Sequence, residues 1–121
     1  MEIFDQLKLN YKIWFSDNQD NGIMGDGKWR ILKAIDETGS LKRACEKLDL
    51  TYRHTWNDLK EIEKSLGFPL LESTRGGADG GSMKLTPAGK KLILAFDHFH
   101  KSVDKLMQNH FNTMLEELKA D

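Results

Sequence analysis

The sequence predicts a mostly helical α+β fold, and three observations carry that prediction. Residues 40–48 and 51–66 have the apolar spacing of two short amphipathic helices. Residues 69–85 have the composition of a hairpin with a glycine-rich tip, and residues 87–118 form a long stretch without a helix breaker after its first turn. With 121 residues, 39% of them hydrophobic and 31% charged, the chain is sized for one domain with its own core.

The N-terminal part of the chain alternates apolar and polar residues. This period of two over residues 7–15 is typical of a half-buried strand, which we expect to join the hairpin in one small antiparallel sheet. Residues 16–27 have the Ser, Asp, Asn and Gly content of a loop. A calcium-binding loop starting at Asp17 is excluded, because Lys28 stands at the twelfth position, where a bidentate Glu is needed. The apolar residues of the predicted strand are Leu7, Leu9, Tyr11, Ile13 and Phe15.

Three consecutive helices are predicted next. The first covers residues 26–38 and ends at Gly39. The second starts from Ser40 as its N-cap, and the third starts from Thr51 as its N-cap and ends at Gly67. The predicted buried stripes are Leu41, Ala44, Cys45 and Leu48 on the second helix, and Tyr52, Trp56, Leu59 and Leu66, with Ile62 beside them, on the third.

The outer face of the third helix is polar and basic. Arg53 and Asn57, one turn apart, are the residue types that form bidentate hydrogen bonds with guanine and adenine edges in the major groove. They follow the N-cap within two turns, where a recognition helix contacts bases. A charge stripe alone indicates only a solvated helix face, and that alternative stays open. The stripe comprises Arg53, His54, Asn57, Lys60 and Lys64.

The hairpin is predicted from two short strands, residues 69–73 and 82–85. The glycine- and alanine-rich residues 76–81 give its tip a low profile, with Arg75 and Lys84 at the shoulders. A phosphate-binding nucleotide loop is excluded, because the residues after the second glycine are not Lys and Ser or Thr. An ordinary hairpin has the same composition. Following a helix pair, however, this hairpin predicts a winged helix-turn-helix whose wing contacts a minor groove or a phosphate.

The last predicted helix starts at Thr86 as N-cap with Pro87 in its first turn. About 32 helical residues would span ~48 Å, which is longer than so small a domain needs. The apolar residues recur at alternating spacings of four and three, as in a coiled-coil seam. We therefore expect residues 1–86 to form a DNA-binding domain and residues 87–121 a dimerisation helix of the same structural unit. The seam comprises Leu92, Phe96, Phe99, Val103, Leu106 and His110.

Charge is distributed unevenly along the chain. The whole chain has a formal net charge of −1, whereas residues 40–91 hold ten Lys or Arg and seven Asp or Glu. The predicted DNA-binding half is therefore mildly basic, and its flanks are acidic. This distribution permits binding to nucleic acid without requiring it.

Other classes of function lack their residues in this sequence. No apolar run approaches the ~20 residues of a membrane span, and the N-terminus has no signal-peptide pattern, so we expect a cytoplasmic protein with no membrane partner. The single cysteine, Cys45, excludes an internal disulfide. His98 and His100 lie two apart on a predicted helix and point in different directions, so we expect neither a metal nor a cofactor. No nucleophile or carboxylate has a visible catalytic partner, so we expect no enzyme.

Three motifs resemble one family. Residues 51–56, residues 75–81 and the run Leu85, Thr86 and Gly89 together resemble the N-terminal DNA-binding domain of the molybdate-responsive regulators called ModE. The resemblance covers residues 5–115, and the helix pair is also similar to the wider LysR-type group. It implies a homodimeric transcription factor that binds an inverted repeat, with residues 75–81 as its wing. It also places Tyr52, Arg53 and His54 in the recognition segment, with Trp56 as a core anchor.

The ModE resemblance leaves the origin of a signal open. The molybdate-binding domain that would follow the DNA-binding domain is missing from these 121 residues. We expect either a regulator that senses nothing itself, or one whose signal arrives through a separate sensor protein or through the helix seam.

We predict a homodimeric, sequence-specific DNA-binding transcriptional regulator of the ModE-like type, whose partners are double-stranded DNA and a second copy of the chain. The alternative is a winged-helix protein-interaction module that acts through the long C-terminal helix, which the overall acidity favours. A metal- or oxyanion-binding sensor lacks visible ligands. The predicted DNA-binding residues are Ser40, Lys42, Arg43, Thr51, Tyr52, Arg53, His54, Asn57, Lys60, Arg75, Gly76, Gly77 and Lys84.

Overall fold

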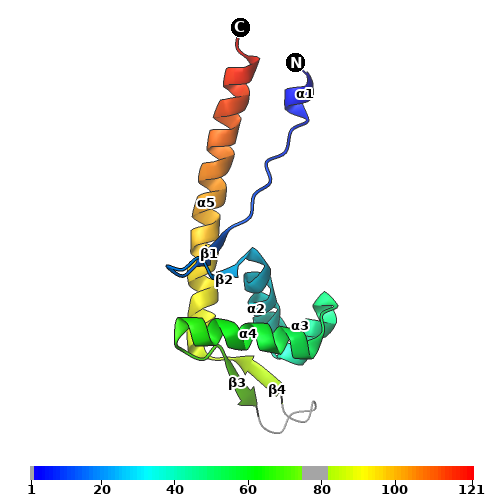
Figure 1. Ribbon diagram of the computed structural model, residues 1–121. Coiled ribbons are helices and arrows are strands. Elements are labelled where there is room, and N and C mark those ends of the chain that lie inside the picture. Colours follow the sequence, from blue (N-terminus) through cyan, green and yellow to red (C-terminus); the bar gives the residue numbers. More distant parts are fainter. Residues whose placement is uncertain (1, 75–81) are drawn as a thin grey trace.

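The computed structural model describes residues 2–74 and 82–121 of the chain (Figure 1). It confirms the mostly helical α+β fold, with small antiparallel sheets and a long C-terminal helix that extends away from the other helices. The elements, in chain order, are α1 Glu2–Asp5, β1 Trp14–Ser16, β2 Gly22–Gly25, α2 Asp26–Thr38, α3 Leu41–Leu48, α4 Tyr52–Leu66, β3 Leu71–Thr74, β4 Ser82–Leu85 and α5 Pro87–Lys119.

One hydrophobic core lies where α2, α3, α4 and the start of α5 meet. Ile93 and Phe96 are the α5 residues that belong to it, and Met24 joins from β2. We call this part, residues 22–74 and 82–96, the head. The largest side chains that are fully buried in it are Leu32, Ile35, Leu41, Leu59 and Leu70.

The predicted helix boundaries are confirmed, and their chemistry explains them. Gly39 and Gly67 end α2 and α4 with φ angles of 85° and 83°, a conformation in which glycine pays no penalty for a side chain. The Ser40 hydroxyl accepts a hydrogen bond from the Arg43 amide, and the Thr86 hydroxyl accepts one from Gly89. Thr51 stands at the N-cap position of α4, but its side chain forms no capping hydrogen bond.

The predicted N-terminal strand is wrong in its length and in its partner. Only Trp14–Ser16 form a strand, β1, which pairs with β2 inside the segment expected to be a loop. β3 and β4 form a separate two-stranded sheet, so the N-terminal strand and the hairpin do not share one sheet. The alternation nevertheless reports burial correctly, because residues 9, 11, 13 and 15 are half-buried and residues 10, 12, 14 and 16 are exposed.

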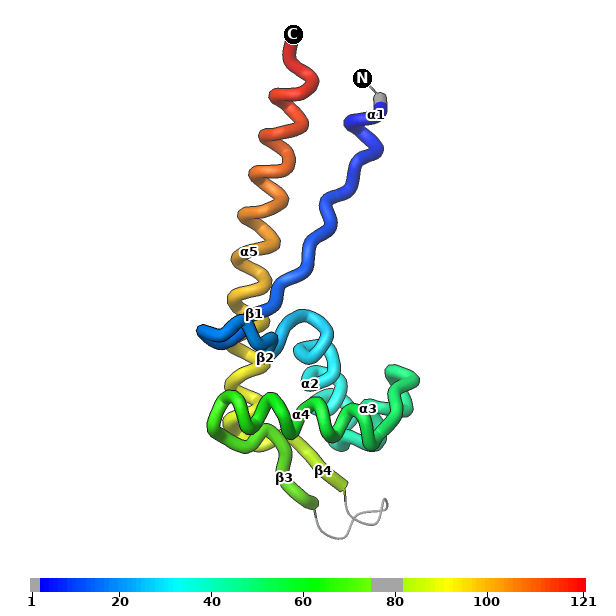
Figure 2. The backbone as a smooth tube through the Cα atoms, viewed as in Figure 1, coloured from blue at the N-terminus to red at the C-terminus, as the bar shows by residue number. Residues whose placement is uncertain are grey.

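Residues 2–13 form an N-terminal arm beside α5, in which the short helix α1 is followed by the extended residues 6–13 (Figure 2). This explains why the period of two does not give a longer strand: the arm packs on a helix, which offers no row of free backbone groups for pairing. Two polar contacts join it to α5. The Tyr11 hydroxyl donates to Asp104, and Lys119 forms an ion pair with Asp5.

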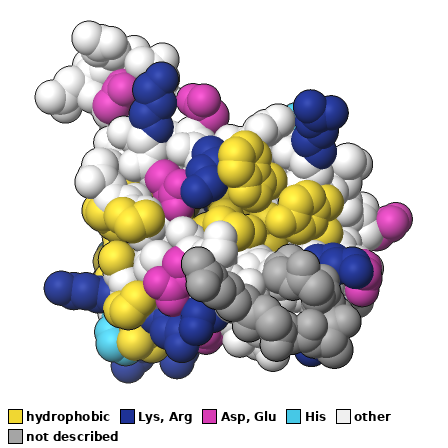
Figure 3. All heavy atoms as spheres, turned by 90° about the horizontal axis from the view of Figure 1, so that it is seen from below, with side chains coloured by type: hydrophobic (Ala, Val, Ile, Leu, Met, Phe, Trp, Pro, Cys, Tyr) yellow, Lys and Arg dark blue, Asp and Glu magenta, His cyan; other side chains and the backbone are white. Residues whose placement is uncertain are grey.

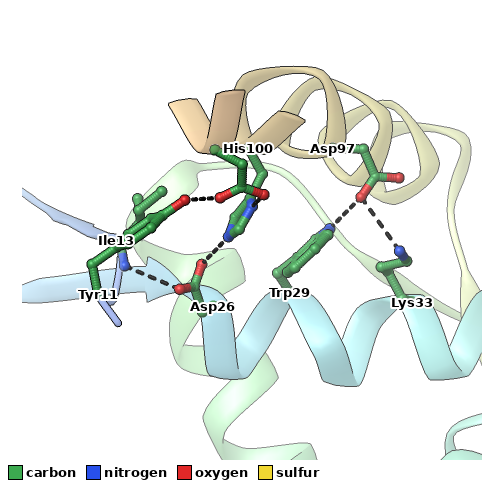
Figure 4. A network of polar contacts seen from close by, with 8 residues as sticks. Tyr11, Ile13, Asp26, Trp29, Lys33, Asp97 and His100 are labelled. Carbon is green, nitrogen blue, oxygen red and sulfur yellow. Dashed lines mark hydrogen bonds and ion pairs between the residues drawn. The ribbon is translucent and has the colours of Figure 1, made fainter. Parts of the chain in front are cut away.

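A polar joint connects the arm, the start of α2 and α5 (Figure 4). Asp26 accepts a hydrogen bond from the Ile13 amide at 3.1 Å and contacts His100 Nε2 at 3.1 Å. His100 Nδ1 lies 2.8 Å from Asp104, so the ring donates to both carboxylates only when both nitrogens carry protons. The same imidazole stacks on Trp29, with ring centroids 4.8 Å apart.

The indole of Trp29 extends this joint along α2 and α5. Its Nε1 donates to Asp97 at 2.6 Å, and the Lys33 ammonium lies 3.6 Å from the same carboxylate and 4.6 Å from the centre of the Trp29 ring. Lys33, Trp29 and Asp97 therefore hold α2 against α5 through one hydrogen bond, one ion pair and one cation–π contact (Figure 4). Tertiary contacts, rather than a short loop, fix the direction in which α5 leaves the head.

Within the described part of the chain, no helix is long and apolar enough to cross a membrane. The 33-residue helix α5 is long enough, but charged side chains interrupt it throughout.

Candidate DNA-binding interface

α3 and α4 form the helix-turn-helix that the sequence predicts. Asp49 ends α3 in the left-handed conformation, with φ of 56°, and α4 begins three residues later. The buried face of α3 carries Leu41, Ala44 and Cys45. Burial raises the pKa of the Cys45 thiol above its ordinary value, and a hydrogen bond with Thr55 opposes that rise. Cys45 is therefore a protonated core residue of the motif.

The inner face of α4 differs from the predicted stripe. Thr55, Leu59 and Ile62 are its buried residues, whereas Tyr52 is 42% exposed. Trp56 is half-buried and packs against the core from its edge. Thr55, which forms a hydrogen bond with Cys45, lies on the inner face in place of Tyr52, whereas Leu59 and Ile62 are buried as predicted. The Tyr52 ring therefore lies on the solvent side, among the predicted DNA-binding residues.

The outer face of α4 presents the predicted reading residues together. Arg53, His54 and Asn57 are all exposed in the first two turns, and Thr51 is exposed just before them. Their spacings of three and four place them on one surface. Seen from below, the molecule carries Lys and Arg side chains next to hydrophobic ones (Figure 3).

Lys60 is engaged within its own helix. Its ammonium lies 3.0 Å from the Glu63 carboxylate and 5.4 Å from the centre of the Trp56 ring. The Glu63 carboxylate, 11% exposed, also accepts hydrogen bonds from the amides of Leu70 and Leu71 at 2.6 and 2.9 Å. Burial raises the pKa of Glu63, but the hydrogen bonds from Leu71, Lys60 and Leu70 lower it by more, so the net shift is downward. Glu63 thereby ties the end of α4 to β3.

Asp58 and Lys28 are residues of this surface that the sequence analysis missed. Asp58 lies one turn beyond His54, and its carboxylate is 3.6 Å from His54 Nε2 and 2.6 Å from the Lys28 ammonium. Lys28 reaches it from α2, so it neutralises the carboxylate that α4 carries beside its reading face. The spacing of His54 and Asp58 was visible as a helical pair, but the 30-residue separation of Lys28 and Asp58 left no pattern.

The predicted residues around α3 divide into two kinds. Lys42 and Arg43 are exposed at the start of α3. Ser40 is only 4% exposed, and its hydroxyl is used by the cap of α3. Its side-chain oxygen is therefore directed at the first turn of α3, as is usual for an N-cap residue, and the predicted role of Ser40 at the DNA backbone stays a prediction.

The hairpin is confirmed as an antiparallel pair up to the edge of its tip. Leu71, Glu72, Ser73 and Thr74 face Leu85, Lys84, Met83 and Ser82 in register. Lys84 on β4 lies 3.8 Å from Glu72 across the strands, and both side chains are about half exposed. The predicted wing residues Arg75, Gly76 and Gly77 lie outside the described residues.

The predicted seam of α5 is divided between the head and solvent. Phe96 is 7% exposed and belongs to the core, whereas Phe99 and Leu106 are 50% and 57% exposed. Leu92 and Val103 are half-buried, and His110 is exposed. Farther along, Met114 and Leu118 are also exposed, at 44% and 50%. Beyond Phe96, α5 therefore carries a row of large apolar side chains that neither the head nor the arm covers.

Comparison with known proteins decides the family. Residues 27–90, more than half of the chain, match the family model described as bacterial regulatory helix-turn-helix protein, lysR family. The chain belongs to this LysR family. The matched residues run from the start of α2 to the first turn of α5, so they contain the helix-turn-helix and the hairpin described above. Proteins of this family are DNA-binding transcription regulators and not enzymes.

Curated relatives place this LysR-type domain near ModE. The chain is 35% identical over 86 residues to the molybdenum-pterin-binding protein MopB of Rhodobacter capsulatus, covering 71% of this chain and 32% of that protein. It is 34% identical over 68 residues to the transcriptional regulator ModE of Haemophilus influenzae, covering 56% and 27%. With the DNA-binding transcriptional dual regulator ModE of Escherichia coli K12 it shares 29% identity over 96 residues, covering 79% and 33%. The chain spans about a third of the length of these relatives.

Solved structures of LysR-type domains have the same fold. The CbnR_DBD-DNA complex matches 73% of this chain and 95% of that chain, with a TM-score of 0.56 and 18% identity. A LysR-family regulator from Eggerthella lenta DSM 2243 matches 61% of this chain and 99% of that chain, with a TM-score of 0.50 and 24% identity. At such identities the similarity concerns the fold and not the individual contacts.

The described residues also bear on metal binding. Within residues 2–74 and 82–121, no group of three or more His, Cys, Asp or Glu side chains is placed to hold a metal ion. In the polar joint, His100 stands between two carboxylates. Those three side chains already satisfy one another and the Ile13 amide.

Proposed function

We propose that this LysR-type domain acts as a homodimeric, sequence-specific transcriptional regulator whose helix α4 reads the major groove. One observation carries the proposal: Arg53, His54 and Asn57 are exposed together on the first two turns of the second helix of the motif. Arg and Asn form bidentate hydrogen bonds with guanine and adenine edges. Thr51 and Tyr52, exposed at the start of the same helix, complete the reading surface.

The remaining basic residues serve the DNA backbone in this proposal. Lys42 and Arg43 lie at the exposed start of α3, and Lys84 lies on β4 at the root of the wing. Lys60 lies on the same side of α4, but its ammonium forms an ion pair with Glu63 at 3.0 Å. It therefore contributes less to DNA binding than a fully solvated lysine would. Ser40 acts indirectly, because its hydroxyl caps the start of α3. For Arg75, Gly76 and Gly77 at the wing tip, the proposal rests on the sequence alone.

The test of DNA reading compares two arginines. Selection of duplexes from a random pool identifies the target, and Arg53→Ala should then weaken specific binding by about 1–3 kcal/mol and relax preference at one base position. Arg30→Ala is the control, because Arg30 is also exposed but lies on α2. Uniform weakening across all sequences would reduce Arg53 to a phosphate contact.

The salt dependence of binding to random duplex DNA tests the proposal more broadly. Each neutralised phosphate adds close to one unit to the slope of log affinity against log salt. A slope near zero would contradict DNA binding altogether. It would favour the second candidate, a winged-helix module that binds proteins through α5.

The homodimer is proposed from the uncovered face of α5. Phe99 and Leu106 are at least half exposed, with Val103 half-buried between them and His110 one turn beyond. Their alternating spacings of four and three are those of a two-helix seam. A second copy of α5 would cover these side chains. At about 1.5 Å per residue the helix is ~50 Å long, so two such helices can hold two reading heads on one duplex. Phe96 has the spacing of the seam, but its side chain is buried in the core of the head.

The test of the dimer uses two leucines with equal exposure. Leu106 and Leu94 are both 57% exposed on α5, but they point in directions about 120° apart around the helix axis. Leu106→Glu should convert the dimer to a monomer in sedimentation equilibrium and should weaken binding to a paired half-site target. Leu94→Glu should leave the dimer intact. A monomeric wild-type chain, or equal behaviour of the two variants, would refute a dimer through this seam.

The proposal also covers the source of a regulatory signal. The MopB relative is named as a molybdenum-pterin-binding protein, and the chain corresponds to about a third of its length. We propose that the described domain itself holds no molybdate site and responds to a separate sensor or to events at the α5 seam. Calorimetry that detected stoichiometric molybdate binding by this chain would overturn that proposal.

A further inference from the structure

A second recognition surface lies on the head, in a groove between the β1–β2 hairpin, the start of α2 and the turn from α3 to α4. The groove has a volume of about 720 Å³. Its floor is apolar and is formed by Ile23 and Met24 of β2, Ile31 of α2, and Leu48 and Leu50 at the end of α3. In Figure 1 the β1–β2 hairpin and the β3–β4 hairpin lie on opposite sides of α4, so this groove is away from the wing.

The rim of the groove is positively charged. Lys12, Lys28 and Arg30 all line it, and its described lining contains neither Asp nor Glu. Lys28 is paired with Asp58 at 2.6 Å. Among the ion pairs between described residues, none involves Lys12 or Arg30. Two exposed cations therefore flank an apolar floor in a chain whose formal net charge is −1.

Trp14 forms the lip of this groove and is the most exposed of the large apolar residues, at 65%. Leu50, which also lines the groove, is 40% exposed. Exposed Trp with neighbouring Arg is the composition in which protein interfaces concentrate their binding energy. The exposure of Trp14 and Leu50 also argues against a small ligand, because pockets for small molecules bury most of the ligand surface.

We propose that this groove docks a partner protein through a segment that carries a large apolar side chain beside Asp or Glu residues. The apolar side chain would occupy the floor against Trp14 and Leu50, and the carboxylates would pair with Lys12 and Arg30. The proposal goes beyond DNA reading and does not depend on it. It identifies a place where a second protein can act on the regulator while α4 and the wing stay free.

The test selects the partner chemistry directly. A random peptide library displayed on phage is panned against the full chain, and enriched peptides are synthesised and titrated by fluorescence anisotropy. Enriched peptides should contain an aromatic or large aliphatic residue next to Asp or Glu. Trp14→Ala and Arg30→Glu should each weaken their binding by about 10-fold or more. Circular dichroism melting of each variant verifies its fold, and the two variants alter different elements.

Matched controls lie on α5. Leu94→Ala removes an apolar side chain with similar exposure, and Lys105→Glu reverses an exposed charge; both should bind the peptides as the wild type does. Three results would overturn the proposal: no enrichment, enriched peptides without acidic residues, or peptide binding that Trp14→Ala and Arg30→Glu leave unchanged. Displacement of the peptide by random duplex DNA would also overturn it, because the groove would then belong to the DNA surface.

Discussion

The head and the stem of this molecule, where the stem is the N-terminal arm together with α5 beyond Phe96, are stabilised in different ways. The head encloses a core whose central side chains are fully buried; Leu32, Leu41 and Leu59 are each 0% exposed. On the stem, Phe99 and Leu106 are half exposed or more, and Tyr11 and Asp5 join the arm to α5 by polar contacts. The head exposes apolar surface beside Leu50, at the edge of its core, whereas the stem carries its large apolar side chains on a surface that a partner would cover.

The polar contacts of the head are also more buried than those of the stem. In the head, Glu63 is 11% exposed and accepts two backbone amides in addition to Lys60. In the stem, Asp5 and Lys119 form an ion pair whose side chains are 67% and 40% exposed. Water screens the second kind of contact, so it adds little stability. Buried contacts therefore stabilise the head, whereas the polar contacts of the stem lie where water reaches them.

The largest expected effect separates the two regions directly. Leu59→Ala, in the centre of the head, should lower the free energy of unfolding by about 2–5 kcal/mol, because it leaves a cavity among fully buried neighbours. Leu118→Ala, at a half-exposed position of the stem on α5, should change it by less than about 0.5 kcal/mol. Urea denaturation followed by circular dichroism measures both. Equal losses would mean that head and stem unfold as one equally packed unit.

A smaller effect is expected from the buried carboxylate of the head. Glu63→Gln should lower the free energy of unfolding by about 1–3 kcal/mol at neutral pH, because an amide cannot accept both backbone hydrogen bonds and pair with Lys60. The folded pKa of Glu63 lies below its ordinary value of 4.5. The stabilisation of the fold by ionised Glu63 is therefore complete above pH 4.5. It is lost as the pH falls below 4.5 and through the folded pKa of Glu63.

Unfolding at neutral and at acidic pH tests this sign. The difference between wild type and Glu63→Gln should shrink on acidification. Glu61→Gln is the matched control, since Glu61 lies two residues away on the exposed side of α4 and should behave as the wild type at both pH values. A difference that grew on acidification would contradict the assigned hydrogen bonds.

The smallest expected effect concerns the polar joint. His100→Leu removes contacts with Asp26 and Asp104. It should lower the free energy of local opening at the joint by about 1 kcal/mol. The arm should then open more often, with faster exchange of the Ile13 amide proton, while amides in the core of α4 keep their protection. His98→Leu, at an exposed position of the same helix, is the control. Uniform acceleration across the head would show that the joint supports the whole fold.

The helices could be predicted closely because their signals are local. Gly39, Gly67, Ser40 and Thr86 act within one turn of their own position, and each stands at the boundary expected of it. The reading residues Arg53 and Asn57 are exposed as expected for the same reason. The predicted N-terminal strand failed because a period of two records which residues are buried but not whether the covering surface is a strand or a helix.

The sequence by itself determined the order of the parts, the helix ends and the residues of α4 that face outward. Caps, glycines and apolar spacing decide these within a few residues. Only the tertiary structure decided that Ser40 is buried, that Lys28 neutralises Asp58 across 30 residues, and that Phe96 belongs to the core while Phe99 stays exposed. These outcomes depend on which segments meet in space, and packing between distant segments leaves no periodic trace in the chain.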